Sequence, residues 1–320
     1  MTLTRRSLLA GGPAMAGAAP LPAGRGGAAA SDLDFASALE AARAIRSGQV
    51  SSLELTSRML DRVAQHNGRL NAKVLGGPDG DEARAWRWSL PPARGTRLAD
   101  YRIGYVLDDP RCPVAPEVGD ALAAAVGALR RAGAQLTEGW PPAVNVAEQF
   151  DAYYTLLAAR YTGPVAEDQL ATFRQLAASE DGTYLTRYAR AVTASDAYMQ
   201  TIELRRRRAR AIWQDYFRTH DAFLLPPALV TAFPHDHVGT PLVRTLATPR
   251  GERPYPDLCF WISFASLAGL PATTAPVGLT PGGLPVGIQI VGPYLEDATP
   301  IDLAGRLADV IGGFRPPPGF

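Results

Sequence analysis

Hydrophobic positions recur at helical spacing near the start of the chain and again across residues 146–218. Residues 33–47 predict a short amphipathic helix, because apolar side chains repeat three or four positions apart. Its inward face should carry Leu39, Ala42 and Ile45. Ser51 and Glu54 have the spacing of a capping box, which favours a second helix that begins at Ser51.

The region 146–218 is predicted to be wholly helical, with its longest helix from about Ala194 to Phe217. The period of that helix predicts an inward face made of Tyr198, Ile202, Ala209, Ile212 and Phe217. An apolar run at 222–225 then predicts a buried strand, because Pro226 and Pro227 end it at once.

Residues 102–138 change to a strand, helix and strand pattern. A short apolar strand at 103–107 is followed by a helix that begins at Pro116, where proline costs no hydrogen bond. The apolar stripe of this helix is Val118, Leu122, Ala125 and Leu129. A second strand at 134–137 completes a βαβ unit, which implies two parallel strands.

The last part of the chain predicts a buried helix at 258–268 and strands at 272–277 and 286–291 joined by a glycine-rich turn. A closing helix at 298–311 follows. Hydrophobic and polar residues alternate only weakly in both strands, which predicts that helices cover both faces of the sheet.

Composition adds limits on function. The chain has 320 residues, is 47% hydrophobic and has a net charge of +1, so no electrostatic argument favours nucleic acid or a membrane surface as a partner. The arginine run 205–208 is typical of a solvated helix face. His235 and His237 indicate a solvated loop rather than a metal site, and no cofactor is expected. Cys112 and Cys259 are expected to be two separate thiols.

The first 30 residues resemble a twin-arginine export signal. Arg5 and Arg6 precede a weakly apolar run, and three alanines at 28–30 suit cleavage. We therefore expect export to the periplasm or beyond, with a mature chain that has no membrane segment; the alternative is a cytoplasmic protein. Residues 31–320 should form one α/β domain: a helical pair at 31–75, a turn-rich connector at 76–100, and the remainder at 101–320.

Two glycine-rich motifs connect the chain to a known family. Ala268-Gly269-Leu270-Pro271-Ala272 precedes Gly283-Leu284-Pro285-Val286-Gly287-Ile288-Gln289. This order resembles the amidase signature family, and residues 38–72 and 102–138 are also similar to it. The resemblance implies an α/β fold with a mixed twisted sheet covered by helices on both faces. It also implies amide C–N hydrolysis by a serine, a second serine in a cis peptide, and a lysine.

The chain departs from that family where the chemistry should be. Lys73 is its only lysine, and it stands in Asn-Ala-Lys-Val-Leu-Gly-Gly rather than at the end of the family's strand. No Gly-Gly-Ser-Ser stretch is present, and Ser263 and Ser266 fall in a core helix. We therefore predict no catalytic residue, and an internally shortened amidase that is inactive by the family mechanism.

The alternative is a non-enzymatic protein that binds a small amide-like molecule. It would use the remaining pocket, with Cys259 and Trp261 near its wall. Loss of the catalytic segment should also leave sheet strands with unpaired edges, which are templates for association. The chain is accordingly expected to be poorly soluble, partly molten, or self-associated through an exposed sheet edge.

Overall fold

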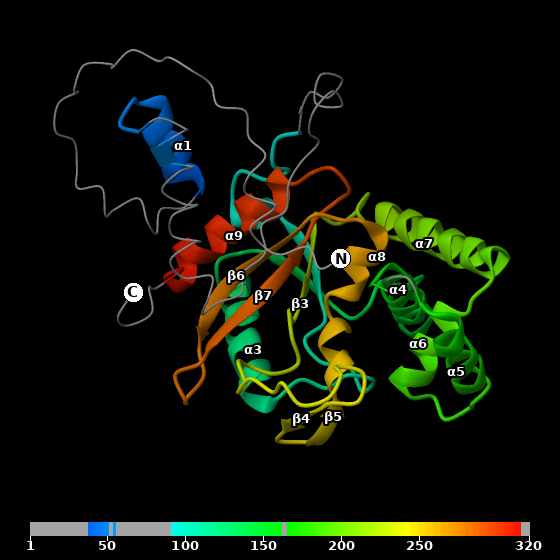
Figure 1. Ribbon diagram of the computed structural model, residues 1–320. Helices are drawn as coiled ribbons and strands as arrows, with labels where there is room; N and C mark the ends of the chain where they lie inside the picture. Colours follow the sequence, from blue (N-terminus) through cyan, green and yellow to red (C-terminus); the bar gives the residue numbers. More distant parts are fainter. Residues whose placement is uncertain (1–37, 51–53, 56–90, 162–164, 315–320) are drawn as a thin grey trace, which may run out of the picture. The chain divides into compact units, whose positions relative to one another are not determined.

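The computed structural model describes residues 38–50, 54–55, 91–161 and 165–314 (Figure 1). The chain divides into two compact units, Met1–Trp86 and Arg87–Phe320, and each is described by itself. The predicted leader, Lys73, most of the second N-terminal helix and residues 76–90 of the predicted connector lie outside the described residues.

The first unit contains helix α1, Ala38–Arg46. The burial expected for Ile45 is wrong, because its side chain is exposed while the neighbouring Ala44 is buried. Residues 54 and 55 are helical, in agreement with a helix that follows Ser51.

A five-stranded mixed sheet forms the centre of the second unit, in the order β2-β1-β3-β7-β6. Its strands are β1 (Arg102–Tyr105), β2 (Gln135–Glu138), β3 (Ala222–Leu225), β6 (Ala272–Leu279) and β7 (Pro285–Val291). β1 is parallel to β2 and β3, whereas β7 is antiparallel to β3 and β6. The predicted βαβ unit and the predicted C-terminal hairpin are both confirmed.

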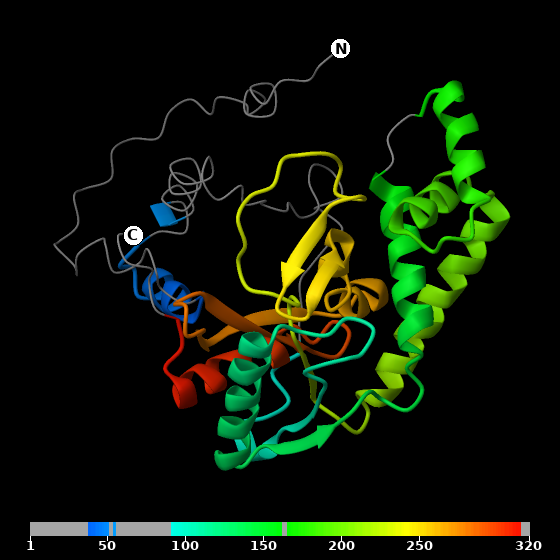
Figure 2. The same cartoon turned by 90° about the horizontal axis from the view of Figure 1, so that it is seen from below.

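Helices α3 (Pro116–Arg131) and α9 (Ala298–Ile311) pack against each other and against β6 and β7 (Figure 1). The remaining helices of this unit pack on one another and form a group at one side of the sheet, which Figure 2 shows from below. They are α4 (Val146–Tyr161), α5 (Glu167–Ala177), α6 (Tyr184–Val192), α7 (Asp196–Tyr216) and α8 (Ser263–Ala268). Helix α7 meets the sheet directly, where Trp213 and Tyr216 lie against Phe223 of β3. Outside these layers lie two short 3-10 helices, Leu98–Asp100 and Tyr255–Cys259, and a hairpin of β4 (Thr245–Thr248) and β5 (Gly251–Pro254).

The apolar stripe predicted for α3 is buried at all four positions. In α7 the burial of Ile202, Ala209 and Phe217 is also confirmed, and Ile212 is half-buried. Tyr198 was expected inside but is 43% exposed. The buried face of α7 begins one turn later, where Ile202 meets Ala152 of α4 and Leu267 of α8. A fully buried side chain that the pattern missed is Trp213.

β6 contradicts the expectation that helices cover both faces of the two C-terminal strands. In β7 the last four residues are buried, but in β6 only Ala275 is, and Leu279 is 63% exposed. The cause is its position in the sheet: β6 is an edge strand, and among the described residues it pairs only with β7. Pro276 and the irregularity between Pro276 and Gly278 suit such an edge, because proline cannot donate to a ladder.

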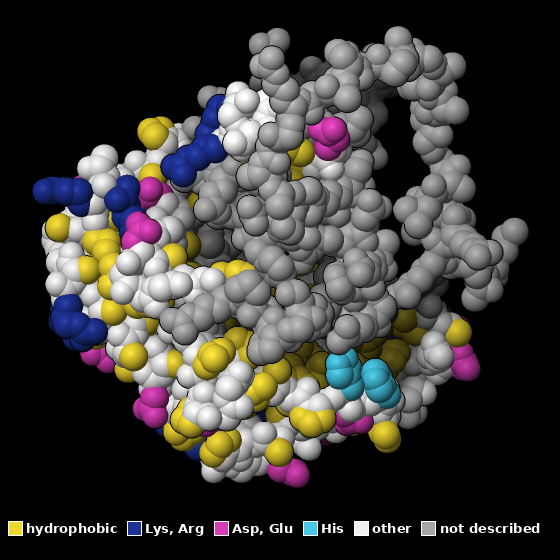
Figure 3. Space-filling view, turned by 90° about the vertical axis from the view of Figure 1, so that its left-hand side faces the viewer, with side chains coloured by type: hydrophobic (Ala, Val, Ile, Leu, Met, Phe, Trp, Pro, Cys, Tyr) yellow, Lys and Arg dark blue, Asp and Glu magenta, His cyan; other side chains and the backbone are white. Residues whose placement is uncertain are grey.

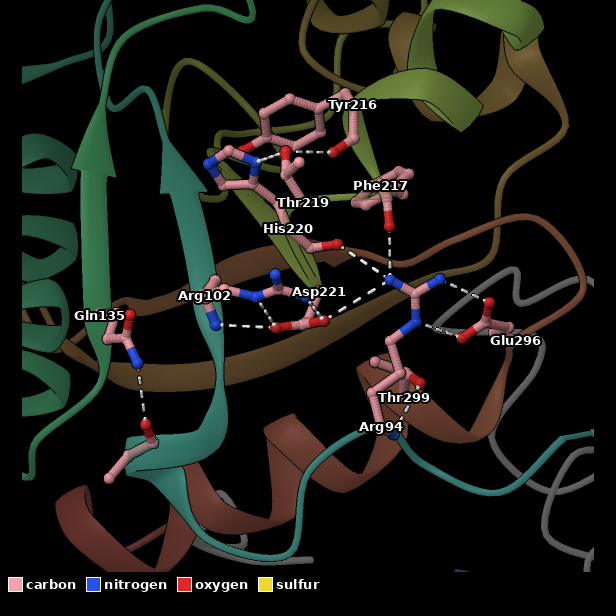
Figure 4. A network of polar contacts seen from close by, with 11 residues as sticks. Arg94, Arg102, Gln135, Tyr216, Phe217, Thr219, His220, Asp221, Glu296 and Thr299 are labelled. Carbon is pink, nitrogen blue, oxygen red and sulfur yellow. Dashed lines mark hydrogen bonds and ion pairs between the residues drawn. The ribbon is translucent and has the colours of Figure 1, made fainter.

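A buried carboxylate ties the sheet to the segment that precedes it (Figure 4). Asp221, only 4% exposed, accepts hydrogen bonds from the backbone nitrogen and Nη2 of Arg102, both at 2.9 Å. Nη1 of Arg94 lies 3.5 Å from the same carboxylate. Nε and Nη2 of Arg94 donate to the two carboxylate oxygens of Glu296 at 2.6 and 2.7 Å. Arg94 also donates to the carbonyl of Phe217. The chain before β1 is thus fastened to the start of β3 and to the loop before α9.

The same contacts predict how stability varies with pH. Burial acts to raise the pKa of Asp221, but the hydrogen bonds and charge of Arg102 outweigh it and hold the pKa below its ordinary value. Its ionised form therefore stabilises the fold above the unfolded pKa of about 3.9, and the contribution is lost as pH falls through the folded value.

Asp221→Asn is expected to lower the free energy of unfolding at neutral pH by about 1–3 kcal/mol, because the hydrogen bonds from Arg102 lose the charge of their buried acceptor. The gap between wild type and variant should shrink as pH falls from about 5 to about 2. Urea titrations at several pH values measure both. A gap of the same size at every pH would contradict the role given to this carboxylate.

Candidate active site

The carboxyl ends of β1, β2 and β3 meet at one edge of the sheet, because the three strands are parallel. The chain passes from β1 to β2 on one side and later places β3 on the other side of β1. Open α/β sheets form ligand crevices at such reversals of strand order. This edge is therefore the candidate site.

A buried carboxylate lies directly after β1. Asp109 accepts a hydrogen bond at 2.9 Å from Nε1 of Trp140, which follows β2. Nη1 of Arg111 pairs with the same carboxylate at 3.2 Å. Asp109 thus bridges the ends of two neighbouring strands, and its charge is already matched by one arginine.

A second buried carboxylate, Asp257, lies in the 3-10 helix before α8. The hydroxyl of Tyr184 donates to its Oδ1 at 2.6 Å, and Nη2 of Arg253 contacts its Oδ2 at 2.6 Å as an ion pair rather than a well-directed hydrogen bond. The same Nη2 donates to the carbonyl of Arg111 at 2.7 Å. Arg253 therefore joins the two carboxylate clusters. Burial raises the pKa of Tyr184, and the bond to Asp257 raises it further, so the tyrosine stays a donor.

Two donors of this region have no hydrogen-bond partner among the described residues: Nε of Arg253 and Nε1 of Trp261, both buried. The ring of Trp261 is stacked near that of Trp140, with centroids 6.3 Å apart and planes 8° apart. Buried donors are rarely left without an acceptor. An acceptor atom of a bound molecule would satisfy either of them.

A small hollow of about 140 Å³ opens beyond the end of β3. Its lining is apolar apart from Thr231: Val118, Pro227, Ala228, Val230, Ala232, Pro285, Val286 and Gly287. Such a hollow suits a small apolar group, since 150 Å³ cavities of this kind hold about one benzene ring.

Neither residue predicted for a pocket wall lines this hollow. Trp261 is fully buried in the core beside Trp140, and Cys259 is half-buried. The prediction of two separate thiols is confirmed, since Cys112 and Cys259 are both free. Burial raises the pKa of Cys112 to about 12 and raises that of Cys259 as well. Neither thiol is therefore activated as a nucleophile.

The described residues contain no serine–lysine pair. Ser263 is buried and donates to the carbonyl of Phe260 at 2.6 Å, Ser266 is exposed, and Lys73 is outside the described part. His235 and His237 lie in an exposed loop with ring centroids 5.7 Å apart. No group of three potential metal ligands exists in the part that the structure covers. Over the same part, no helix has the length and apolar character to cross a membrane.

Four residues that shape this edge were not predicted: Asp109, Tyr184, Arg253 and Asp257. One signal was available for Asp109, which follows a predicted strand in an Asp-Asp-Pro turn at the ligand-binding end of a βαβ unit. The other three come from separate elements, and nothing in their local sequence brings them together.

The comparison with known proteins identifies the family. The model of the family described as Amidase matches residues 79–300, more than two thirds of the chain. The chain belongs to the amidase signature family. Its two glycine-rich motifs at 268–289 lie within the match, so the resemblance proposed from them is confirmed. Residues 38–72 precede the matched range, and their similarity stays a prediction.

Two similar proteins show how much of each chain the similarity covers. The A subunit of glutamyl-tRNA(Gln) amidotransferase from Thermosynechococcus vestitus is 28% identical over 254 residues, which is 71% of this chain and 49% of that protein. The crystal structure of the same kind of subunit from Thermotoga maritima superposes with a TM-score of 0.51 at 22% identity, covering 73% of this chain and 48% of that one. The fold is thus shared, and the chain spans about half the length of these relatives.

Arg253 should carry most of the stability of the carboxylate cluster. Arg253→Met removes the only arginine paired with Asp257 among the described residues and is expected to cost about 3–5 kcal/mol, because a buried charge loses its partner. Arg250→Met is the matched control on the same hairpin. Its ion pair with Asp108 is exposed, so its loss should cost less than about 1 kcal/mol.

Chemical denaturation of both variants measures the difference. Adding Asp257→Asn to Arg253→Met should recover part of the loss, since the unpaired charge is then removed as well. Equal losses in the two arginine variants would show that Asp257 does not depend on Arg253.

Proposed function

We propose that this amidase-family chain does not hydrolyse amides by the serine–lysine mechanism that its resemblance implies. The observation that carries the proposal is that Lys73 is the sole lysine of the sequence. It has neither the strand context of the family's lysine nor a glycine- and serine-rich loop to act on. A lysine base needs a serine within hydrogen-bond reach, and backbone donors for the oxyanion.

The side chains of the candidate site also support the absence of amide hydrolysis. Asp109 and Asp257 are each matched by an arginine, and the thiols of Cys112 and Cys259 are held protonated by burial. These groups bind and orient one another, and none of them is poised to attack a carbonyl carbon. We further propose that the chain is an internally shortened member of its family, which agrees with its span of about half the relatives' length.

The proposal predicts no turnover of simple amides. Purified full chain, incubated with an aryl amide such as an acyl nitroanilide, should release product no faster than buffer does. The direct control is Lys73→Ala, which should behave as the unmodified chain does. Turnover by the unmodified chain that disappears in Lys73→Ala would overturn the proposal, because it would give this lysine the role of the family's base.

A binding role is the second candidate, and two features favour it. The donors at Arg253 Nε and Trp261 Nε1 are buried without partners among the described residues, and an apolar hollow opens at the end of β3. A small amide offers a carbonyl acceptor and an apolar body of matching character. Calorimetry with a panel of small amides tests the binding role: saturable heat without turnover supports it, and the absence of heat counts against it.

A further inference from the structure

A second hollow, of about 160 Å³, opens between α4 and α7. One face of each helix lines it, at positions three or four apart, and α8 contributes Leu267. The α4 side carries Asn145, Glu148, Gln149 and Ala152, and the α7 side carries Arg205, Arg208, Ala209 and Ile212. None of these residues belongs to the candidate site at the strand ends.

The two amide side chains of this hollow have their oxygen atoms occupied. Oδ1 of Asn145 accepts from the backbone nitrogen of Glu148 at 3.1 Å, and Oε1 of Gln149 accepts from Nε1 of Trp213 at 3.1 Å. Each amide also carries an NH₂ group, which can donate to a bound molecule. Gln149 is 5% exposed, and its nitrogen has no acceptor among the described residues.

The charges in the lining are unbalanced toward positive. Arg205 reaches Glu148 and Asp151 only at 3.9 and 3.7 Å, and Arg208 has no ion pair or hydrogen bond within the described part of the chain. Glu148 is the single carboxylate of the lining against two guanidinium groups. The hollow also lies at the first turn of α4, the positive end of the helix dipole.

Apolar side chains provide the other part of the lining. Ala152, Ala209 and Leu267 are buried and pack together, and Ile212 lies one turn beyond Ala209. A volume near 150 Å³ is about that of a cavity that accepts benzene. The hollow therefore has room for one ring. Its polar lining consists mainly of hydrogen-bond donors, and Glu148 is the one carboxylate among them.

We infer that this hollow binds a small organic carboxylate whose apolar body is about the size of a benzene ring. The carboxylate accepts hydrogen bonds from Arg208 and from the amide donors of Asn145 and Gln149, while the ring lies against Ala209 and Leu267. A neutral amide of the same shape forfeits the charge-assisted bonds, which are about twice as strong as neutral ones. This binding does not depend on whether the chain hydrolyses amides.

Titration of the full chain with benzoate tests the inference, by ligand-observed NMR at low salt. Binding should saturate with a Kd of about 1 mM or tighter, a strength within reach of a fragment of this size. Benzamide, its neutral counterpart, should bind at least about tenfold more weakly. Arg208→Gln should weaken benzoate at least about fivefold, whereas Arg207→Gln, on the adjacent exposed arginine outside the lining, should change it less than about twofold.

Three results would overturn the inference: no saturation by benzoate below about 20 mM, displacement of bound benzoate by benzamide at equal affinity, or equal weakening of benzoate binding by the two arginine variants. Both arginines are exposed, so the variants should retain the melting profile of the wild type. The comparison of benzoate with benzamide uses the unmodified chain and stays decisive if a variant fails to fold. An amide-hydrolysis assay reads a different quantity, so the two proposals fail separately.

Discussion

The carboxylate of Asp221 is the contact on which the arrangement of the second unit depends most. It lies at the start of β3, the strand that joins the parallel part of the sheet to its antiparallel part. Through Arg102 it fixes the start of β1, and through Arg94 it fixes the segment before β1 to the loop that leads into α9. Two arginines compensate this buried charge, and displacing either of them would remove part of that compensation.

The sequence predicted the elements of this unit far better than the chemistry between them. Local periodicity defined α3 and α9, and β3 was expected at the residues where it occurs, because each depends on its own hydrophobic pattern. The predicted burial of Tyr198 and the predicted helix coverage of both faces of β6 were wrong for a shared reason. Burial depends on which neighbour arrives from elsewhere in the chain, and the period of a segment carries no record of that.

The same limit applies to the candidate site. Tyr184, Arg253 and Asp257 belong to a helix, a strand and a 3-10 turn. Their hydrogen bonds and ion pair exist only once the hairpin β4–β5 and α6 are placed around the strand ends. The prediction that the family's catalytic residues are missing, by contrast, needed the sequence alone, because it rests on the presence of a single lysine in 320 residues. The two polar regions also differ in charge balance. Asp109 and Asp257 at the strand ends are each paired with an arginine, whereas Nε2 of Gln149 in the hollow between α4 and α7 has no partner among the described residues.

Figure 3 shows two histidines near apolar side chains on one face of the molecule. The backbone of β6, which forms one edge of the sheet, is poorly suited to pairing with a further strand. A strand added along that edge would need an uninterrupted row of donors and acceptors. Pro276 removes one donor, and the irregular step to Gly278 shifts the register that follows. Continuous pairing is left only for Ala272–Ala275, and so short a ladder gives little purchase for growth into a fibre. The interruptions at Pro276 and Gly278 therefore act against the addition of strands from further copies at this edge.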